Sequence, residues 1–307
     1  MPTHTVVDVL PRDAIPSIDD PTFDSTFEGT DGETVIVVET DDAVRAYPTR
    51  ILQNHEVVND SDGDPFAVTW CPLCASGVVY DRRVDGRTLT FGVSGKLADN
   101  DLVLYDRETS SEWKQSSGRC LSGPLSGTEL TVLAARTTTL GAFRDRYPDG
   151  VVLQVPEWGS GDYGTDRFAD YADTDYVGPG GDERLRESID DWDHDFGPKA
   201  VTLGLTIDGD VRGYPRPVVE RASGVVTDTL GDSPVVVFAT ASGVFAYEGI
   251  GAFEPTADSD RFRGDGTTWD AVTGEAEDGR ELTPLPGRRL FAFAWQDDRG
   301  PDAFYEG

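Results

Sequence analysis

Short hydrophobic runs separated by turn residues dominate the first half of the chain. Residues 34–40 form a continuous β-branched run, which is typical of a strand buried on both faces. Asp-Gly pairs at 62–63 and 85–86 mark tight turns between later runs. The predicted strands of this half are 34–40, 43–47, 66–70, 77–84, 88–93, 102–105 and 112–115. Many short strands at close spacing predict a barrel or a sandwich.

Helical patterns are few and short. Pro48 suits the start of a helix, and a helix over residues 49–55 would place Ile51, Leu52 and His55 on one face. Residues 140–146 are the other helical segment of this half. The predicted fold class is therefore mainly β, or β-rich α+β, with few short helices.

The second half of the chain resembles the first. The run from residue 206 to 215 is similar to the run from 39 to 48, and Ala-Ser-Gly-Val at 241–244 matches residues 75–78. A repeat on this scale predicts the duplication of one β-rich unit. We therefore expect two tandem, similar barrel- or sandwich-like units from an internal duplication.

Four segments follow from these patterns. Residues 1–30 are punctuated by proline and predict an extended N-terminal arm. Residues 31–155 form a first β-rich domain, and residues 200–307 form a second one. Between them, residues 156–199 are acidic, aromatic and aperiodic, which predicts a long connection.

The two copies differ most where the scarce cysteines and histidines lie. Cys71 and Cys74 form a Cys-Pro-Leu-Cys motif in the first copy, and His55 precedes them. The second copy has Phe-Ala-Thr at 238–240 in place of the motif and no histidine at the position of His55. Joint absence of all three side chains suggests that they form one site, present in the first domain only.

A Cys-x-x-Cys turn can aim two thiols at one metal ion or close them into a disulfide. With His55, the cysteines supply three ligands, the number that catalytic zinc or copper sites use while one position stays open. We therefore expect a zinc or copper ion bound by His55, Cys71 and Cys74. The residues that could add a ligand or line an adjoining pocket are Glu56, Asp60, Asp81, Ser94, Lys96, Asp101, Trp113, Gln115 and Cys120.

Two other interpretations of the cysteines stay open. Pro72 directly follows the first cysteine, as in several thiol–disulfide oxidoreductases, and this favours a redox role for Cys71 and Cys74. Those enzymes place the motif at a helix N-terminus, whereas residues 75–80 predict a turn and a strand. In the third interpretation the thiols are buried packing groups of a metal-free binding or scaffold module.

The net charge of −31 comes from 57 acidic and 26 basic residues. Lys96, Lys114 and Lys199 are the only lysines, and an acidic surface with little lysine is typical of a protein adapted to high salt. The acidic residues are spread along the chain, which favours salt adaptation over a tail that binds a cationic partner. Nucleic acid and anionic membranes would be repelled.

The sequence contains no apolar run of about 20 residues, as a membrane span requires, and no basic patch followed by an apolar stretch near Met1. Its three cysteines cannot form a disulfide framework. We expect a soluble, cytoplasmic protein whose partner is a small molecule or a metal ion. The sequence leaves the oligomeric state and any reaction open.

Several motifs resemble one known family, the domain of unknown function 3179, here in an acidic, haloarchaeal-type form. They include Ile-Pro-Ser-Ile-Asp-Asp-Pro at 15–21, His-Glu-Val-Val-Asn-Asp at 55–60 and Thr-Trp-Cys-Pro-Leu-Cys at 69–74. The chain departs from the family pattern at Ala75, where glycine is usual, and at residues 53–54, where Asn-Trp is usual. The resemblance implies a common fold and carries no activity, substrate or cofactor.

Salt adaptation predicts that the protein unfolds when salt is removed, because unscreened carboxylates then repel one another. Far-ultraviolet circular dichroism in about 2 M and about 0.05 M KCl measures this loss, since screening is strong at the first concentration and weak at the second. A spectrum that is identical and fully folded in both solutions would contradict the interpretation.

Overall fold

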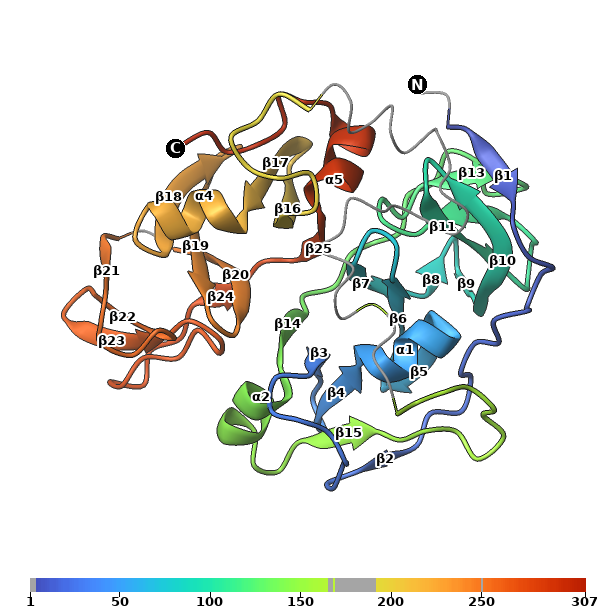
Figure 1. The fold of residues 1–307 in the computed structure, drawn as a ribbon, viewed down its shortest axis with the longest axis horizontal. Helices are drawn as coiled ribbons and strands as arrows, with labels where there is room; N and C mark the ends of the chain where they lie inside the picture. Colours follow the sequence, from blue (N-terminus) through green and yellow to red (C-terminus); the bar gives the residue numbers. More distant parts are fainter. Residues whose placement is uncertain (1–3, 165–167, 169–191, 250) are drawn as a thin grey trace.

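Strands dominate the computed structural model, which describes residues 4–164, 168, 192–249 and 251–307. The mainly β fold class predicted from the sequence is confirmed (Figure 1). The helices of these ranges are α1 (Thr49–His55), α2 (Leu140–Arg146), α4 (Arg216–Arg221) and α5 (Ala292–Arg299). No helix in the described part is long and apolar enough to cross a membrane. Most of the acidic connection, residues 169–191, lies outside the described residues.

The N-terminal arm contributes a strand to each of two five-stranded sheets. The first sheet has the order β1 (Val6–Asp8), β10 (Phe91–Ala98), β11 (Asp101–Asp106), β12 (Glu112–Lys114) and β13 (Cys120–Ser122). The second has the order β14 (Arg136–Thr139), β3 (Thr34–Glu39), β4 (Val44–Pro48), β15 (Val151–Leu153) and β2 (Phe23–Asp24). Backbone hydrogen bonds therefore fix the arm at two places.

The arm crosses β10 at a bulge. The register of β10 against β11 shifts between Val93 and Lys96, and Gly95 between them has a φ of +80°. A Cβ atom on Gly95 would lie 2.1 Å from the carbonyl oxygen of Leu10. Glycine is required because only a residue without a side chain permits this approach and this φ.

One six-stranded sheet contains strands from both halves of the chain. Its order is β17 (Asp210–Pro215), β16 (Val201–Ile207), β25 (Gly287–Phe291), β7 (Ser76–Asp81), β6 (Asp64–Cys71) and β5 (Val57–Asp62). Strand β25 pairs with β16 along its length and meets β7 where Arg289 opposes Gly77. The last strand of the chain thus joins the two halves (Figure 1).

Three smaller sheets complete the described fold. The first comprises β18 (Val225–Leu230), β19 (Ser233–Thr240), β20 (Gly243–Glu248) and β24 (Thr283–Pro284). The second comprises β21 (Phe253–Pro255), β22 (Arg261–Gly264) and β23 (Thr267–Asp270). The third pairs β8 (Arg83–Val84) with β9 (Arg87–Thr88). The single strand predicted over 77–84 is divided into β7 and β8. The two strands are separated by Arg82, whose side chain donates to the carbonyls of Leu89 and Asp60.

The two predicted helices of the first half are confirmed with their bounds. The conformation of Pro48 (φ −63°, ψ 129°) is extended, so it precedes α1 without breaking it. Glu56 ends the helix in the left-handed region with φ 59°. Helix α2 begins after Thr139, whose hydroxyl accepts from the backbone N–H of Ala142.

The two halves present the same elements in the same order. Strands and helix β3, β4, α1, β5, β6 and β7 correspond to β16, β17, α4, β18, β19 and β20, and β14–α2 corresponds to β25–α5. Each half also contains a tyrosine and an arginine that donate to one aspartate. These sets are Tyr47, Arg45 and Asp60 in the first half, and Tyr214, Arg212 and Asp228 in the second. Origin by duplication stays a prediction.

Two arginines connect the halves reciprocally. Arg136 on β14 donates from Nη2 to the carbonyl of Thr273 in the second half at 2.9 Å. Arg288 on β25 donates from Nη2 to the carbonyl of Ser117 in the first half at 3.2 Å. Each half thus donates one arginine hydrogen bond to a backbone carbonyl of the other half. A reciprocal arrangement of this kind is typical of an interface between two similar units related by a twofold axis.

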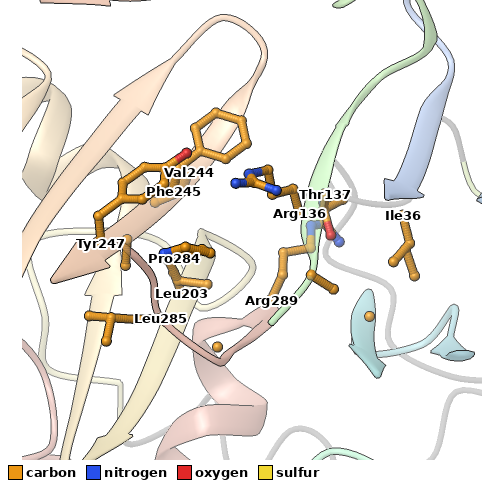
Figure 2. Close-up of a pocket in the computed structure, with 14 residues that line it drawn as sticks. Ile36, Arg136, Thr137, Leu203, Val244, Phe245, Tyr247, Pro284, Leu285 and Arg289 are labelled. Atoms are coloured by element: carbon orange, nitrogen blue, oxygen red, sulfur yellow. The ribbon is translucent and has the colours of Figure 1, made fainter. Parts of the chain in front are cut away.

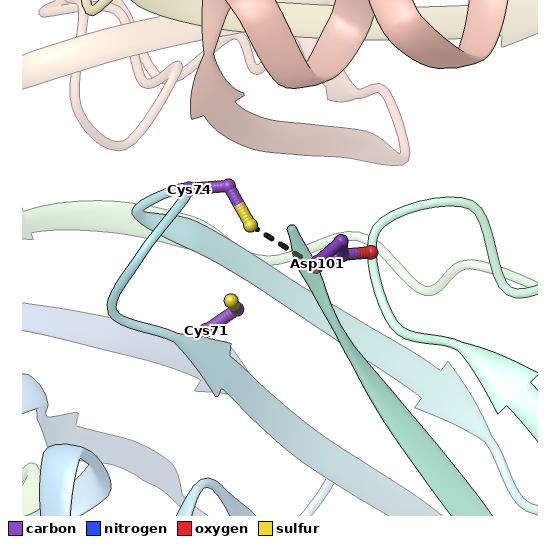
Figure 3. Close-up of side chains that lie close together, drawn as sticks. All are labelled: Cys71, Cys74 and Asp101. Carbon is purple, nitrogen blue, oxygen red and sulfur yellow. Dashed lines mark hydrogen bonds between the residues drawn. The ribbon is translucent and has the colours of Figure 1, made fainter. Parts of the chain in front are cut away.

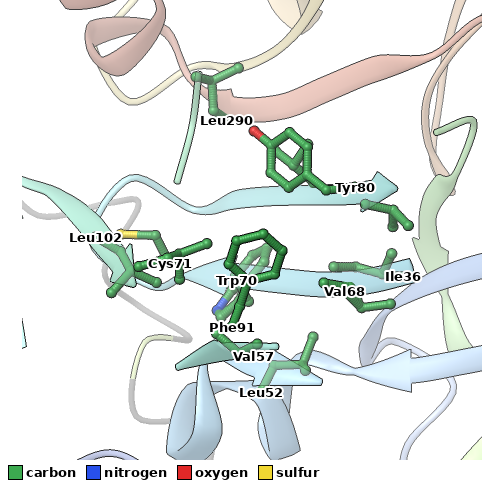
Figure 4. Close-up of a cluster of buried hydrophobic side chains, with 14 of the residues drawn as sticks. Ile36, Leu52, Val57, Val68, Trp70, Cys71, Tyr80, Phe91, Leu102 and Leu290 are labelled. Carbon is green, nitrogen blue, oxygen red and sulfur yellow. The ribbon is translucent and has the colours of Figure 1, made fainter. Parts of the chain in front are cut away.

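The largest hydrophobic core surrounds β6 and also takes side chains from both halves (Figure 4). Trp70 and Cys71 at the end of β6 belong to it, together with Leu290 and Phe291 of β25. Burying a large apolar side chain contributes about 1.5–3 kcal/mol. Both cysteines of the motif therefore lie in the largest hydrophobic core of the described residues.

The two aspartates of the repeated contact, of which Asp60 is buried and Asp228 is partly buried, are expected to matter to a similar extent in both halves. Replacing Asp60 or Asp228 by alanine leaves a tyrosine hydroxyl and an arginine without their acceptor, which costs about 1–3 kcal/mol of unfolding free energy. Asp64→Ala is the control, because the side chain of Asp64 is 75% exposed, and surface changes usually stay within about 0.5 kcal/mol. Urea unfolding at constant high KCl measures the three values. Equal stability of all three variants would contradict the assignment.

Candidate metal centre

The Cys-Pro-Leu-Cys turn joins β6 to β7. Cys71 ends β6 and pairs with Ser76, which begins β7. The backbone N–H of Phe291 on β25 donates to the carbonyl of Cys74 at 2.8 Å, so both halves hold the turn. Ala75 follows with a φ of +45°, a left-handed conformation that costs a residue with a side chain about 1–2 kcal/mol. This conformation explains why glycine suits that position in the family pattern.

Asp101 reaches the turn from a different hairpin. Asp99 and Asn100 both have positive φ, as a tight hairpin turn requires, and they place Asp101 at the start of β11. One ligand atom each of Cys71, Cys74 and Asp101 lies within 4.8 Å of the others. The thiol of Cys74 donates to Oδ1 of Asp101 at 3.0 Å (Figure 3). The three side chains thus form a compact group that could hold a metal ion.

Burial governs the charge of this group. The exposed fractions of Cys71, Cys74 and Asp101 are 1%, 0% and 1%. Burial raises the pKa of the Cys74 thiol well above its usual value, and the neighbouring Cys71 and Asp101 raise it further. Burial also raises the pKa of Asp101, against the opposing charge of Lys114. Without a cation the group therefore favours a neutral Cys74 thiol, and a bound cation would replace its proton.

A buried lysine lies beside the group. Lys114 on β12 is 1% exposed, and its ammonium group lies 2.6 Å from Oδ1 of Asp298 and 3.3 Å from Oδ2 of Asp99. Burial opposes the charged form of Lys114, but Asp298 and Asp101 outweigh it and raise its pKa. Because Asp298 belongs to α5, this ion pair also joins the two halves. The positive charge of Lys114 favours the ionised form of the Asp101 carboxyl group.

One carboxylate oxygen of Asp101 accepts from the backbone, and the other faces the thiol of Cys74. The backbone N–H of Ser116 donates to Oδ2 of Asp101 at 2.7 Å, which leaves Oδ1 for the group of thiols. Ser76 Oγ and Gln115 Oε1 are buried and have no hydrogen-bond partner. Two thiols and a carboxylate are ligands that zinc accepts. The residues present therefore fit a metal ion.

His55 is placed apart from the cysteines. Its Nδ1 lies 2.7 Å from the carbonyl oxygen of Pro16, and its Nε2 lies 2.7 Å from the hydroxyl of Tyr163. The ring stacks on Tyr163 and meets Trp158 edge-on. Burial lowers its pKa, which favours neutral imidazole. The structure therefore groups Asp101, and not His55, with the two thiols among the described residues.

The other oxygen ligands considered from the sequence also lie outside this group. Asp60 accepts from the hydroxyl of Tyr47, and Asp81 forms an ion pair with Arg83 at 2.8 Å. Glu56 is the residue that ends α1. These carboxylates support the fold rather than the cluster.

Cys120 is the third buried thiol, and it too lies outside the group. Its Sγ donates to the carbonyl of Ser122 at 3.3 Å. Burial raises the pKa of Cys120 to about 11. It has the same chemistry as Cys71 and Cys74 without their neighbours, so it provides a matched control for experiments.

The residues suggested as a pocket wall make structural hydrogen bonds. Ser94 donates to the carbonyl of Val103, Lys96 pairs with Glu112, Trp113 donates to Asp106, and Gln115 donates to Thr69. Asp101 is the residue of that set whose ligand atom is grouped with those of the cysteines. Reasoning from the sequence missed Asp298, which approaches Lys114 from 184 residues away in the chain. The scarcity of lysine was the one signal that could have singled out Lys114.

The Lys114–Asp298 pair predicts a large and non-additive loss of stability. Lys114→Met leaves buried carboxylates without their cation and is expected to cost about 3–5 kcal/mol of unfolding free energy. Adding Asp298→Asn should recover part of this loss, because one of the unpaired charges is then removed. Lys96→Met is the control, since the Lys96–Glu112 pair is 30% exposed on the lysine side and such pairs contribute about 1 kcal/mol or less. Strictly additive effects in a double-mutant cycle would contradict the coupling.

Comparison with known proteins agrees with the sequence motifs. No curated protein and no solved structure matches the chain. A family model described as "Protein of unknown function (DUF3179)" matches residues 12–305. The match covers both halves, the cysteine turn and the joining strand β25. The chain therefore belongs to the DUF3179 family.

Proposed function

We propose that this protein binds one zinc ion through Cys71, Cys74 and Asp101. The observation that carries the proposal is the approach of these three ligand atoms to within 4.8 Å in a fully buried place. Two separate hairpins supply the ligands, so a bound ion would tie the β6–β7 turn to β11. The proposal replaces His55 by Asp101 in the ligand set expected from the sequence.

The mixture of ligands favours zinc over copper. Thiolates bind both Zn²⁺ and Cu⁺, whereas a carboxylate is a common ligand of zinc and a poor one for soft Cu⁺. In zinc sites the Zn–S distance is about 2.3 Å and the Zn–O distance about 2.0–2.2 Å. A separation of ligand atoms within 4.8 Å is compatible with these bond lengths. Copper is the second candidate metal.

Burial favours a metal that stabilises the fold over one that meets a large substrate. Each ligand side chain is at most 1% exposed, so a substrate would have no direct path to the ion without movement of the chain. Binding free energy at such a site adds to folding free energy. Three protein ligands leave one tetrahedral position for a water or another small group. We assign no reaction to the site.

Thiol–disulfide exchange is the second candidate function. It is favoured by the hydrogen bond from Cys74 to Asp101, because a buried carboxylate can accept the thiol proton. An external disulfide would oxidise Cys71 and Cys74 to a disulfide and leave as two thiols, so that electrons and protons balance. Against it, a strand follows the motif where redox enzymes have a helix. A metal-free binding or scaffold module is the third candidate.

The cellular setting belongs to the proposal as well. All three cysteines are free and buried, which suits a reducing cytoplasm, where thiols persist and can bind metal. The spread of acidic residues suits high salt. We place the protein in the cytoplasm of a salt-adapted organism on these grounds.

Metal content tests the proposed function. Protein purified without chelators is expected to contain about one zinc per chain by inductively coupled plasma mass spectrometry, because three ligands from one chain form a single site. The Cys71→Ser, Cys74→Ser double variant should lose the metal, and Asp101→Asn should bind it more weakly. Cys120→Ser should retain it, because Cys120 lies outside the group.

Each alternative has its own result. If the protein contains one copper ion per chain, and the same variants lose it, the proposed site is retained and its metal is copper. Metal-free wild-type protein with a reversible Cys71–Cys74 disulfide would replace the proposal by the redox function. Metal that persists in the folded double variant would contradict the ligand assignment.

A further inference from the structure

A small pocket lies between the two halves, beside the strand that joins them (Figure 2). Its walls come from β3, β7 and β14 on one side, and from β16, β20 and β25 on the other. Its volume is about 20 Å³, which is room for about one water molecule. None of the three proposed metal ligands lines it. Any occupant is therefore a single water molecule or an ion of similar size.

An arginine without a carboxylate partner lines this pocket. Among the described residues, no carboxylate oxygen comes within 4.0 Å of the guanidinium group of Arg289, whereas Arg136 in the same lining pairs with Glu39. Arg289 donates from Nη1 to the carbonyl of Ala75. Most of its donors are left for another acceptor, since a guanidinium group has five N–H bonds.

The isolation of Arg289 is unexpected in this chain. Acidic residues outnumber basic ones by 57 to 26, so a carboxylate partner would be easy to supply. The guanidinium group instead lies over the ring of Trp70, with 5.3 Å between its Cζ atom and the ring centroid. That contact holds the side chain in place but does not neutralise its charge. Arginine cannot lose its proton either, so the charge calls for a counter-ion.

The charges around the pocket leave one positive charge uncompensated. Burial, and then the positive charge of Arg216, lower the pKa of Arg289 to about 10, so that it stays charged at neutral pH. Arg216 pairs with Glu220 and Arg136 pairs with Glu39, so each of these two charges has its own partner. The charge of Arg289 remains. One monovalent anion would balance it.

A second donor without an acceptor belongs to the same lining. Arg136 is 8% exposed, and Figure 2 shows its side chain at this junction together with that of Arg289. Its Nη1 and Nη2 donate to Glu39 and to the carbonyl of Thr273, but its Nε is buried without a hydrogen-bond partner. Buried N–H groups in folded proteins nearly always have an acceptor, which can be a water or a bound ion.

We propose that this pocket binds one chloride ion between the guanidinium group of Arg289 and the Nε–H of Arg136. Chloride is only slightly larger than a water molecule, so it suits the volume of the pocket. It supplies the negative charge that Arg289 lacks and the acceptor that Arg136 lacks. A water molecule would leave the charge unbalanced, and the apolar side chains Ile36, Leu203 and Val244 offer it no hydrogen bonds. This site is independent of the proposed zinc ion.

The ion would connect the two halves at the strand that joins them. Arg136 belongs to β14 in the first half, and Arg289 belongs to β25 in the second. Arg289 also bonds to Ala75, the residue after Cys74, so the ion lies next to the support of the cysteine turn. The stability of the fold would then depend on chloride itself, in addition to the general screening that an acidic surface requires.

Bromide replaces chloride and is located by its anomalous X-ray scattering. Crystals of the full-length protein grown in KBr are expected to show an anomalous peak in the pocket, in contact with Arg289 and with the Nε of Arg136. Crystals of Arg289→Gln should lack this peak. A wild-type crystal whose pocket holds water and no anomalous peak would contradict the proposal. A peak that persists in Arg289→Gln would contradict the role of Arg289.

A change of anion at constant salt measures the effect in solution. The Tm of each protein is compared in KCl and in potassium methanesulfonate at equal concentration, because methanesulfonate has the same charge and is too large for the pocket. The gain in chloride should be larger for the wild-type protein than for Arg289→Gln by about 2 °C or more, since a ligand of the folded state raises the Tm. Comparing the two proteins cancels the effects of each anion on the rest of the surface.

A surface arginine provides the matched control. Arg280 already pairs with Asp265 and Asp278, so Arg280→Gln should keep the full chloride gain of the wild-type protein. Equal gains in the wild-type protein and in Arg289→Gln, or an equal loss in Arg280→Gln, would each overturn the proposal. If Arg289→Gln does not fold, the bromide peak in wild-type crystals decides the question.

Discussion

The pairing of β25 with strands on both of its edges is the constraint on which the rest of the structure depends. On one edge β25 pairs with β16 of its own half, and on the other Arg289 opposes Gly77 of the first half. The largest hydrophobic core takes side chains from both halves because Leu290 and Phe291 then join the cluster that contains Trp70. The same strand holds the cysteine turn and lines the small pocket between the two halves. Neither feature would exist in two independently folded halves.

A difference in one turn explains why, among the residues that the structure describes, the candidate metal centre lies in the first half and has no counterpart in the second. In the second half, Thr240 pairs directly with Gly243, so that β19 and β20 are joined by a two-residue turn. In the first half, Cys71 pairs with Ser76 and the turn between them is longer. The extra residues create the space in which the second thiol can turn towards β11. A longer turn between a corresponding pair of strands thus brings a second thiol close to β11 while the strand pairing stays the same.

Local sequence patterns predicted the secondary structure and fold class of this molecule better than they predicted which residues form the candidate metal centre. The bounds of α1 and α2 follow from proline, capping and helical periodicity, and the β-rich class follows from turn spacing, because all of these act over a few residues. The cluster of Cys71 and Cys74 with Asp101 depends on two hairpins that meet in space, and no short-range pattern reports that meeting. His55 was assigned to the cysteines by nearness in sequence and by the joint absence of the three side chains from the second copy. Its partners Pro16 and Tyr163 are distant along the chain, and they occupy both ring nitrogens.

X-ray absorption spectroscopy at the zinc edge tests the central claim most directly, because it reports the ligands themselves. We expect two sulfur atoms at about 2.3 Å and oxygen ligands at about 2.0–2.2 Å from zinc in the protein purified without chelators. Loss of the sulfur signal in the Cys71→Ser, Cys74→Ser variant would accompany loss of the metal. A spectrum with nitrogen and oxygen ligands only, and no sulfur, would contradict the account.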